Sequence, residues 1–151
     1  MMTSKSNIDI VYHGYLPMYE PYLAALVHIG ITPEVGSYFK LCTAKRQAFG
    51  NLMFIGLDDK LNRVYAMGCR GFDSTIINSQ NGFRKIYNIE SKVCYIGTVK
   101  IANYIPRIVH KMGNYPPLNN TAQRLFYYWY KTAYPKVCSF VKQQVHLLRE
   151  E

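Results

Sequence analysis

Residues 8–30 read IDIVYHGYLPMYEPYLAALVHIG and hold the clearest strand and helix signals of the chain. Residues 8–13 are short, apolar and β-branched, and Gly14 follows them, which predicts a buried strand. Residues 22–29 are apolar nearly all round, which is typical of a buried helix, and Gly30 is suited to its C-cap. A buried strand followed by a turn and a buried helix predicts a sheet covered by helices.

The patterns on either side of this unit extend the same arrangement. Residues 51–56 and 63–68 are apolar runs joined by a polar turn, which predicts a β-hairpin. Two further helices are expected over residues 33–45 and 73–88, and a buried strand over residues 92–99. After that strand the chain is expected to be helical to the C-terminus, apart from a loop at residues 113–120. Pro106 and Pro135 should each mark a kink or the first turn of a new helix. We therefore expect a single α/β domain over residues 8–151, with a mixed sheet of about four strands covered by helices, a helical C-terminal third and a flexible N-terminus at residues 1–7.

Composition supports a folded domain of ordinary size. The 151 residues are 49% hydrophobic, which is enough to bury a core without a disulfide or a metal. Aromatic residues make up 15% and charged residues only 18%, which excludes a disordered chain. Residues 1–10 lack the apolar core of a signal peptide, and the longest apolar stretch, residues 22–31, is shorter than the roughly 20 residues of a membrane span. We expect a cytoplasmic protein without a transmembrane segment.

The cysteines show no metal-binding or redox spacing. The chain has Cys42, Cys69, Cys94 and Cys138, and no two of them form a CxxC pair. In a cytoplasmic protein this pattern favours reduced, mostly buried thiols that form no required disulfide. No cofactor motif is present either, so we expect neither a metal nor a cofactor.

Positive charge is concentrated in the C-terminal half. The net charge is +9, and residues 74–151 carry eleven Lys/Arg against three Asp/Glu, whereas residues 1–73 carry seven against six. Basic and tyrosine residues recur there at helical spacing: Lys100, Tyr104, Arg107 and Lys111, and then Arg124, Tyr128 and Lys131. Such interleaving can bind phosphate backbones and acidic surfaces. The alternative is a solvated face whose tyrosines cover the core while their hydroxyls reach water.

Two histidines and a cysteine form a candidate catalytic cluster. His13 ends the first strand, His28 lies near the end of the first helix, and Cys69 and Arg70 follow the third strand. If these ends share an edge, the side chains suit acid–base or nucleophilic chemistry. The alternative is that His28 is a hydrogen-bonded core histidine and His13 a residue at a strand end, with no role in catalysis.

Two other polar groups have local explanations. Asp73, Ser74 and Thr75 resemble a nucleophile motif, but helix capping accounts for all three. Asp58 and Asp59 resemble paired catalytic acids, but they lie in the hairpin turn, where Asp is common. Neither group is therefore expected to form a site.

Five segments resemble the domain-of-unknown-function family 3189, an uncharacterised family of spore-forming Firmicute bacteria. They are Val11-Tyr12-His13, then Ala24-Ala25 with His28-Ile29-Gly30, the stretch Gly50-Asn51-Leu52-Met53-Phe54-Ile55-Gly56, then Val64-Tyr65-Ala66-Met67-Gly68, and Ala133-Tyr134-Pro135. The resemblance rests on their order and spacing and covers nearly the whole chain from Ile8. It implies no known activity.

One loop departs from that family's pattern. The resemblance implies a Cys and a Gly-Gly-Thr-His-Ser-Ser-like loop after the first strand, where an anion could bind. Here residues 14–21 read GYLPMYEP and lack the Cys, the paired glycines and the small hydroxyls. Two prolines without N–H groups, one acid and bulky side chains do not suit a phosphate cradle, so we expect this turn to bind no nucleotide or phosphate.

These observations predict a non-catalytic interaction protein. We expect its basic C-terminal half to contact an acidic protein, with RNA or another nucleic acid and an anionic surface as alternatives. The binding residues would be Lys100, Tyr104, Arg107, Lys111, Arg124 and Lys131. The other hypothesis is a small enzyme that uses His13, His28 and Cys69.

Overall fold

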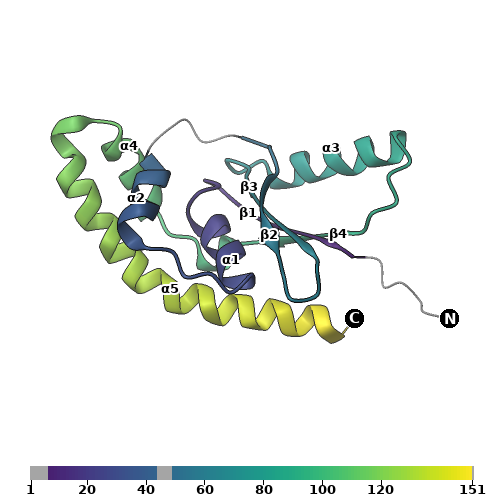
Figure 1. The fold of residues 1–151 in the computed structure, drawn as a ribbon. Helices are drawn as coiled ribbons and strands as arrows, with labels where there is room; N and C mark the ends of the chain where they lie inside the picture. Colours follow the sequence, from purple (N-terminus) through teal and green to yellow (C-terminus); the bar gives the residue numbers. More distant parts are fainter. Residues whose placement is uncertain (1–6, 44–48, 151) are drawn as a thin grey trace.

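The structure is a computed structural model that describes residues 7–43 and 49–150. Its centre is a four-stranded mixed sheet with the order β2-β3-β1-β4 (Figure 1). The strands are β1 (Asp9–Gly14), β2 (Met53–Leu57), β3 (Arg63–Gly68) and β4 (Val93–Gly97). Strand β1 pairs in parallel with both β3 and β4, while β2 and β3 form the antiparallel hairpin. The expected α/β fold and its mixed sheet are confirmed.

Side chains of the strands alternate between the two faces of the sheet. One face carries the large hydrophobic core, and the other carries a much smaller one. Ile10 and Tyr12 of β1 face the main core, which α1 (Glu20–His28), α2 (Val35–Thr43), α4 (Ile105–Gly113) and α5 (Asn119–Glu150) help to form. Val11 faces the other way and packs with Met67 and Cys69 beneath α3 (Asp73–Ile86). Helix α3 lies alone on its side of the sheet in Figure 1, and it contains no fully buried residue.

A cluster of aromatic rings joins the helices of the main core. The ring centroids of Tyr19 and Trp129 lie 5.6 Å apart, and those of Tyr38 and Phe126 lie 5.1 Å apart. Edge-to-face pairs of this kind add to the stabilisation that burial provides. Because Tyr19 directly precedes α1, the cluster fixes the start of that helix beside the end of β1.

The helical C-terminal third begins differently from the expectation. Lys100 lies in a short 3₁₀ helix, η1 (Val99–Ile101), and α4 begins only at Ile105. Pro106 lies in the first turn of α4. Backbone N–H groups in a first turn make no hydrogen bond within the helix, so the proline costs the helix no hydrogen bond there. Pro135 lies inside α5, which continues through it, and a second 3₁₀ helix, η2 (Pro116–Leu118), precedes α5.

Smaller expectations concern the second helix, the N-terminus, the cysteines and membrane-spanning helices. The helix expected over residues 33–45 is α2, and its expected last two residues fall outside the described part of the chain. The expected flexible N-terminus also lies outside it, apart from residue 7. Cys42, Cys69, Cys94 and Cys138 form no disulfide bond with one another. Within residues 7–43 and 49–150, no helix combines the length and the apolar composition of a membrane span.

Candidate active site at the carboxyl edge of the sheet

The three parallel strands end at one edge of the sheet, where α/β proteins commonly bind ligands. Each of these strands ends in glycine, at Gly14, Gly68 and Gly97. A side chain at Gly14 would collide with Thr98, and one at Gly68 would collide with Pro17. The glycines therefore let the connecting segments pass close over the strand ends.

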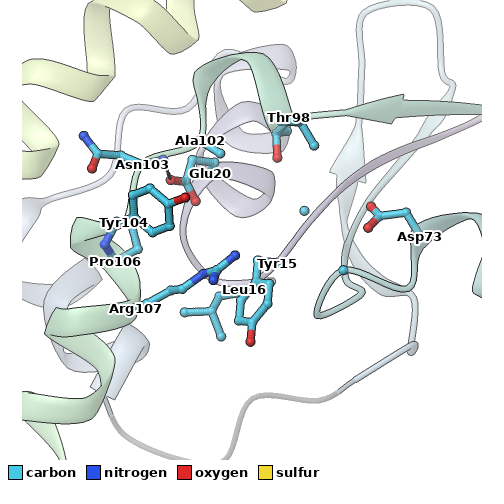
Figure 2. A pocket seen from close by; sticks show the side chains of 13 residues that line it. Tyr15, Leu16, Glu20, Asp73, Thr98, Ala102, Asn103, Tyr104, Pro106 and Arg107 are labelled. Atoms are coloured by element: carbon cyan, nitrogen blue, oxygen red, sulfur yellow. Dashed lines mark hydrogen bonds between the residues drawn. The ribbon is translucent and has the colours of Figure 1, made fainter.

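A cavity of about 300 Å³ opens at this edge (Figure 2). We call it the carboxyl-edge cavity. The side chains that give it its chemistry are Tyr15, Glu20, Asp73, Thr98, Tyr104 and Arg107. Figure 2 shows Asp73 on one side of the hollow, with Arg107 and Tyr104 on the opposite side. Its volume is at the lower end of the range for small-molecule sites.

Glu20 is a buried carboxyl group in the wall of this cavity. It is the first residue of α1, it is 5% exposed, and its Oε1 accepts a hydrogen bond from the Asn103 N–H at 3.2 Å. Burial raises the pKa of Glu20 to about 7, although the Asn103 N–H and the positive charge of Arg107 oppose the rise. A carboxyl group with such a pKa can both donate and accept a proton near neutral pH.

Arg107 is the cation of the cavity, and aromatic rings hold its guanidinium group. Its Cζ atom lies 3.5 Å from the centroid of the Tyr15 ring and 5.5 Å from that of Tyr104. Cation–π contacts of this kind fix the planar group and leave its N–H donors free to bind a carboxylate in two places. In Figure 2 the group points into the cavity from α4.

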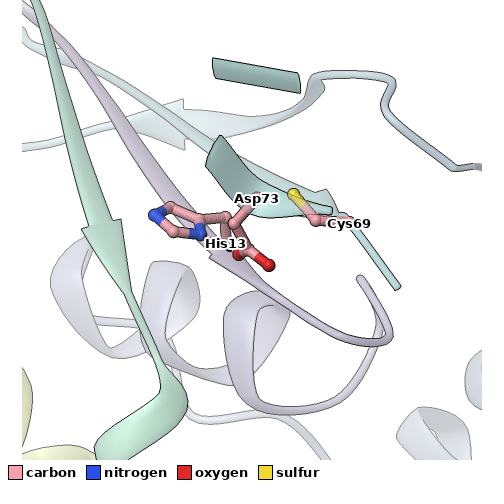
Figure 3. Close-up of side chains that lie close together, drawn as sticks. All are labelled: His13, Cys69 and Asp73. Atoms are coloured by element: carbon pink, nitrogen blue, oxygen red, sulfur yellow. Dashed lines mark hydrogen bonds and ion pairs between the residues drawn. The ribbon is translucent and has the colours of Figure 1, made fainter. Parts of the chain in front are cut away.

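A second cluster adjoins the cavity through Asp73 (Figure 3). Nδ1 of His13, at the end of β1, is hydrogen-bonded to Oδ2 of Asp73, the first residue of α3. Cys69, which follows β3, completes the cluster, and one polar atom from each of the three side chains lies within 4.8 Å of the others. Burial, and then the neighbouring Asp73 carboxylate, raise the pKa of the Cys69 thiol to about 12. At neutral pH this thiol is therefore protonated and poorly nucleophilic.

The role expected for Asp73 is wrong in one respect. The N-cap of α3 is Phe72, and no side chain caps that helix end, so the Asp73 carboxylate is not committed to capping. A tight turn brings Asp73 back to Cys69: the Phe72 N–H donates to the Cys69 carbonyl at 2.8 Å. Arg70 and Gly71 in this turn have positive φ angles of 47° and 88°. Glycine at position 71 was the one signal in the sequence for such a reversal.

His28 belongs to a separate network, so the expected grouping of His13, His28 and Cys69 forms only in part. The Tyr12 hydroxyl lies 2.8 Å from Nδ1 of His28, and Nε2 of His28 lies 3.0 Å from Oδ2 of Asp58. Oδ1 of Asp58 also accepts the N–H groups of Lys60 and Asn62 in the hairpin turn. Both ring nitrogens are thus engaged, which is the hydrogen-bonded core histidine of the alternative prediction.

Hydrogen bonds also set the charge of Asp58. Burial alone would raise the pKa of Asp58, but the bonds from His28 and Asn62 outweigh it and hold the pKa below its usual value. The carboxylate is therefore ionised at neutral pH and joins α1 to the hairpin. This geometry explains Asp58 as a structural residue, in agreement with its turn position.

The basic residues of the C-terminal half are exposed but do not form one helical stripe. Arg107 and Lys111 lie on α4, Arg124 and Lys131 lie on α5, and Lys100 precedes α4 in η1. Lys100, Tyr104, Arg107 and Lys111 would share one face only on an unbroken helix, and the chain has no such helix there, because α4 begins only after Tyr104. Tyr104 is 74% exposed, and Tyr128 is 60% exposed.

Comparison with known proteins places the chain in a family without assigning an activity to it. Neither a curated protein nor a solved structure matches the chain. One family model matches residues 9–145, a span that contains the whole sheet, the carboxyl-edge cavity and the His13–Cys69–Asp73 cluster. The chain therefore belongs to the family described as "Protein of unknown function (DUF3189)".

Proposed function

We propose that this protein binds a small molecule with a carboxylate group in the carboxyl-edge cavity and catalyses a proton transfer on it. The observation that carries the proposal is Glu20, a buried carboxyl group with a pKa of about 7 in the wall of a cavity. Strongly perturbed carboxyl groups in clefts are frequent at catalytic sites. Glu20 would be the acid–base residue, and Arg107 would hold the carboxylate of the substrate.

The geometry of Arg107 supports a carboxylate as the anionic group of the ligand. A fixed guanidinium group matches the two oxygens of a carboxylate in a bidentate pair. Glu20 and Asp73, which both line the cavity, would repel the double negative charge of a phosphate. The Gly14–Pro21 turn, which we expect to differ from the family's glycine-rich loop, adds no phosphate cradle, because Pro17 and Pro21 have no N–H and are buried.

The His13–Asp73 pair forms the wall of the carboxyl-edge cavity that lies opposite Arg107. Its hydrogen bond orients Asp73, which reaches the cavity, while His13 remains buried at 9% exposure. Cys69 is buried, and its high pKa argues against a covalent intermediate on sulfur. Proton transfer without a nucleophile is therefore the reaction class that these groups suit best.

Ligand-observed NMR with a library of small carboxylic acids tests the binding step. The library holds hydroxy acids, oxo acids, amino acids and dicarboxylates, with nucleoside phosphates as a set that we expect not to bind. Arg107→Gln should weaken binding of the carboxylates by at least about tenfold, the equivalent of losing one charge-assisted contact. Lys131→Gln, which removes an exposed cation on α5, is the matched control and should bind as the wild type does.

The binding step would be contradicted by either of two results. In one, no carboxylate binds to the wild-type protein. In the other, carboxylates bind equally well to wild type and Arg107→Gln, which would locate the binding outside the cavity. Binding of nucleoside phosphates that disappears on substitution in the Gly14–Pro21 turn would replace the carboxylate with a phosphate ligand.

A second function, contact with an acidic protein, is supported by the exposed tyrosines beside the basic residues. Tyr104 and Tyr128 are largely exposed, and each lies within four residues of a lysine, Lys100 and Lys131 respectively. Residues 92–149 hold nine Lys/Arg and no acid. Exposed tyrosine beside positive charge is a common composition for protein interfaces. Nucleic acid and an anionic surface remain the alternatives for this half of the chain.

A further inference from the structure

We propose that His13, Cys69 and Asp73 form a zinc-binding site with an open coordination position that faces the carboxyl-edge cavity. No metal is expected from the sequence, because the three residues come from different segments and have no metal-ligand spacing. Folding brings them together from the end of β1, the residue after β3 and the first turn of α3 (Figure 3). The inference does not depend on the proposed function.

The arrangement of the potential ligand atoms supports the site. An imidazole nitrogen, a thiol sulfur and a carboxylate oxygen lie within 4.8 Å of one another. The ligand atoms of a tetrahedral zinc ion lie about 3.3 to 3.7 Å apart, given metal–ligand distances of about 2.0 to 2.3 Å. Nδ1 is the ring nitrogen of His13 that faces Asp73, so it is the atom that would bind the ion.

The chemistry of the donors selects the type of metal. The Cys69 thiol would release its proton to solvent when it binds the ion, because a coordinated cation stabilises the thiolate. A thiolate is a soft ligand that favours zinc over magnesium or calcium, both of which prefer oxygen. An imidazole and a carboxylate complete a mixed set that is typical of zinc. Three protein ligands, rather than four, are typical of sites that keep one position open for water or substrate.

The position of Asp73 gives the site access to solvent. His13 and Cys69 are buried, but Asp73 is partly exposed and lines the carboxyl-edge cavity. An ion could therefore enter through the cavity and keep its fourth position on that side. Arg70, Gly71 and Phe72, which separate Cys69 from Asp73, are exposed, so small movements of this turn can bring the Asp73 carboxylate closer to the other two ligands.

Cobalt titration of the metal-free full-length protein tests the site directly. Co²⁺ adopts the geometry of Zn²⁺, and a cobalt–thiolate bond produces an intense charge-transfer band in the near ultraviolet. We expect one equivalent of Co²⁺ to produce this band, together with strong visible bands of a tetrahedral ion, and we expect Zn²⁺ to abolish both. The wild-type spectrum decides the question even if a variant fails to fold.

Substitutions then identify the ligands. Cys69→Ser should lose the near-ultraviolet band, and Asp73→Asn should weaken Co²⁺ binding by at least about tenfold. Cys138→Ser, a half-buried cysteine on α5, is the matched control and should keep the band. The proposal is overturned if the wild type gives no thiolate band, or if the band survives in a folded Cys69→Ser protein.

Discussion

Asp73 lies 60 residues after His13 in the sequence, yet its carboxylate is hydrogen-bonded to Nδ1 of that histidine. The contact joins the end of β1 to the start of α3 and so fastens α3 to its own face of the sheet at the carboxyl edge. Because Asp73 also lines the carboxyl-edge cavity, the same residue belongs to the cavity wall and to the proposed zinc site. These two sites are chemically distinct and can be tested separately.

The raised pKa of Glu20 predicts that stability falls as the pH rises. The folded protein holds the Glu20 proton up to about pH 7, whereas the unfolded chain releases it near the ordinary pKa of a glutamic acid, 4.5. Between these values the folded state binds more protons, so the free energy of unfolding decreases with pH. The two pKa values correspond to a loss of roughly 3 kcal/mol between pH 4.5 and pH 8.

Urea denaturation of wild type and Glu20→Gln at both pH values measures this effect. Gln keeps the shape of the side chain and its acceptor for the Asn103 N–H, but it cannot ionise. The stability of Glu20→Gln relative to wild type should therefore be greater at pH 8 than at pH 4.5 by roughly 3 kcal/mol. An equal difference at the two pH values would mean that the pKa of Glu20 is not raised.

Two glycines should respond in opposite directions to the same substitution. Gly82 lies within α3, and a methyl group there meets no atom within 4 Å, so Gly82→Ala should stabilise the protein by about 0.5–1 kcal/mol. A methyl group at Gly68 would collide with the backbone and ring of Pro17, so Gly68→Ala should destabilise by about 1–3 kcal/mol. Thermal melting of both variants checks the pair, and a stabilised Gly68→Ala would refute the close approach at the strand end.

His28 should matter for stability and not for the chemistry of the cavity. His28→Ala removes a partner from both Tyr12 and the buried Asp58 carboxylate, which should cost about 3–5 kcal/mol. Gln143→Ala, at an exposed side chain on α5, is the control and should stay within about 0.5 kcal/mol of wild type. A small effect of His28→Ala in chemical denaturation would argue against the structural role of this network.

The basic half should bind acidic polymers through charge. Titration with poly-glutamate, as a probe for an acidic protein surface, should give binding that weakens steeply with salt. The double variant Lys100→Glu/Lys111→Glu should bind at least about tenfold more weakly, while Arg107 and the cavity stay intact. Lys40→Glu/Lys60→Glu carries the same charge change in the N-terminal half and is the control. If both double variants lose the same affinity for poly-glutamate, the binding depends on the net charge of the protein and not on the basic half.

Much of the fold could be predicted from the sequence, because its signals are local. The β-branched run of residues 8–13 and the hairpin around Asp58 indicate their strands directly, and both are confirmed. The residue at which the C-terminal helices begin is harder to predict from the sequence. Lys100 and Tyr104 fit a helical spacing, but the prolyl residue at 106 fits the first turn of a helix better than its interior.

The candidate site depended on contacts that no local pattern encodes. The sequence places His13 at the end of one predicted strand and Cys69 just after another, and the parallel arrangement brings them to one edge. Asp73 was assigned to capping, since the sequence does not show that Arg70 and Gly71 reverse the chain. From the sequence Glu20 is only a charge that repels anions, because its burial and its contact with Asn103, 83 residues further along the chain, form only in the folded protein.

Solvent deuterium uptake tests the proposed proton transfer most directly. Each carboxylic acid that binds the wild-type protein is incubated with it in D₂O, and proton NMR follows the carbon-bound hydrogens of the ligand. We predict that at least one ligand exchanges a hydrogen for deuterium, and that Glu20→Gln slows the exchange by about 100-fold or more while binding persists. Bound carboxylates that exchange no hydrogen, or an exchange rate that Glu20→Gln leaves unchanged, would contradict the assignment of Glu20 as the acid–base residue.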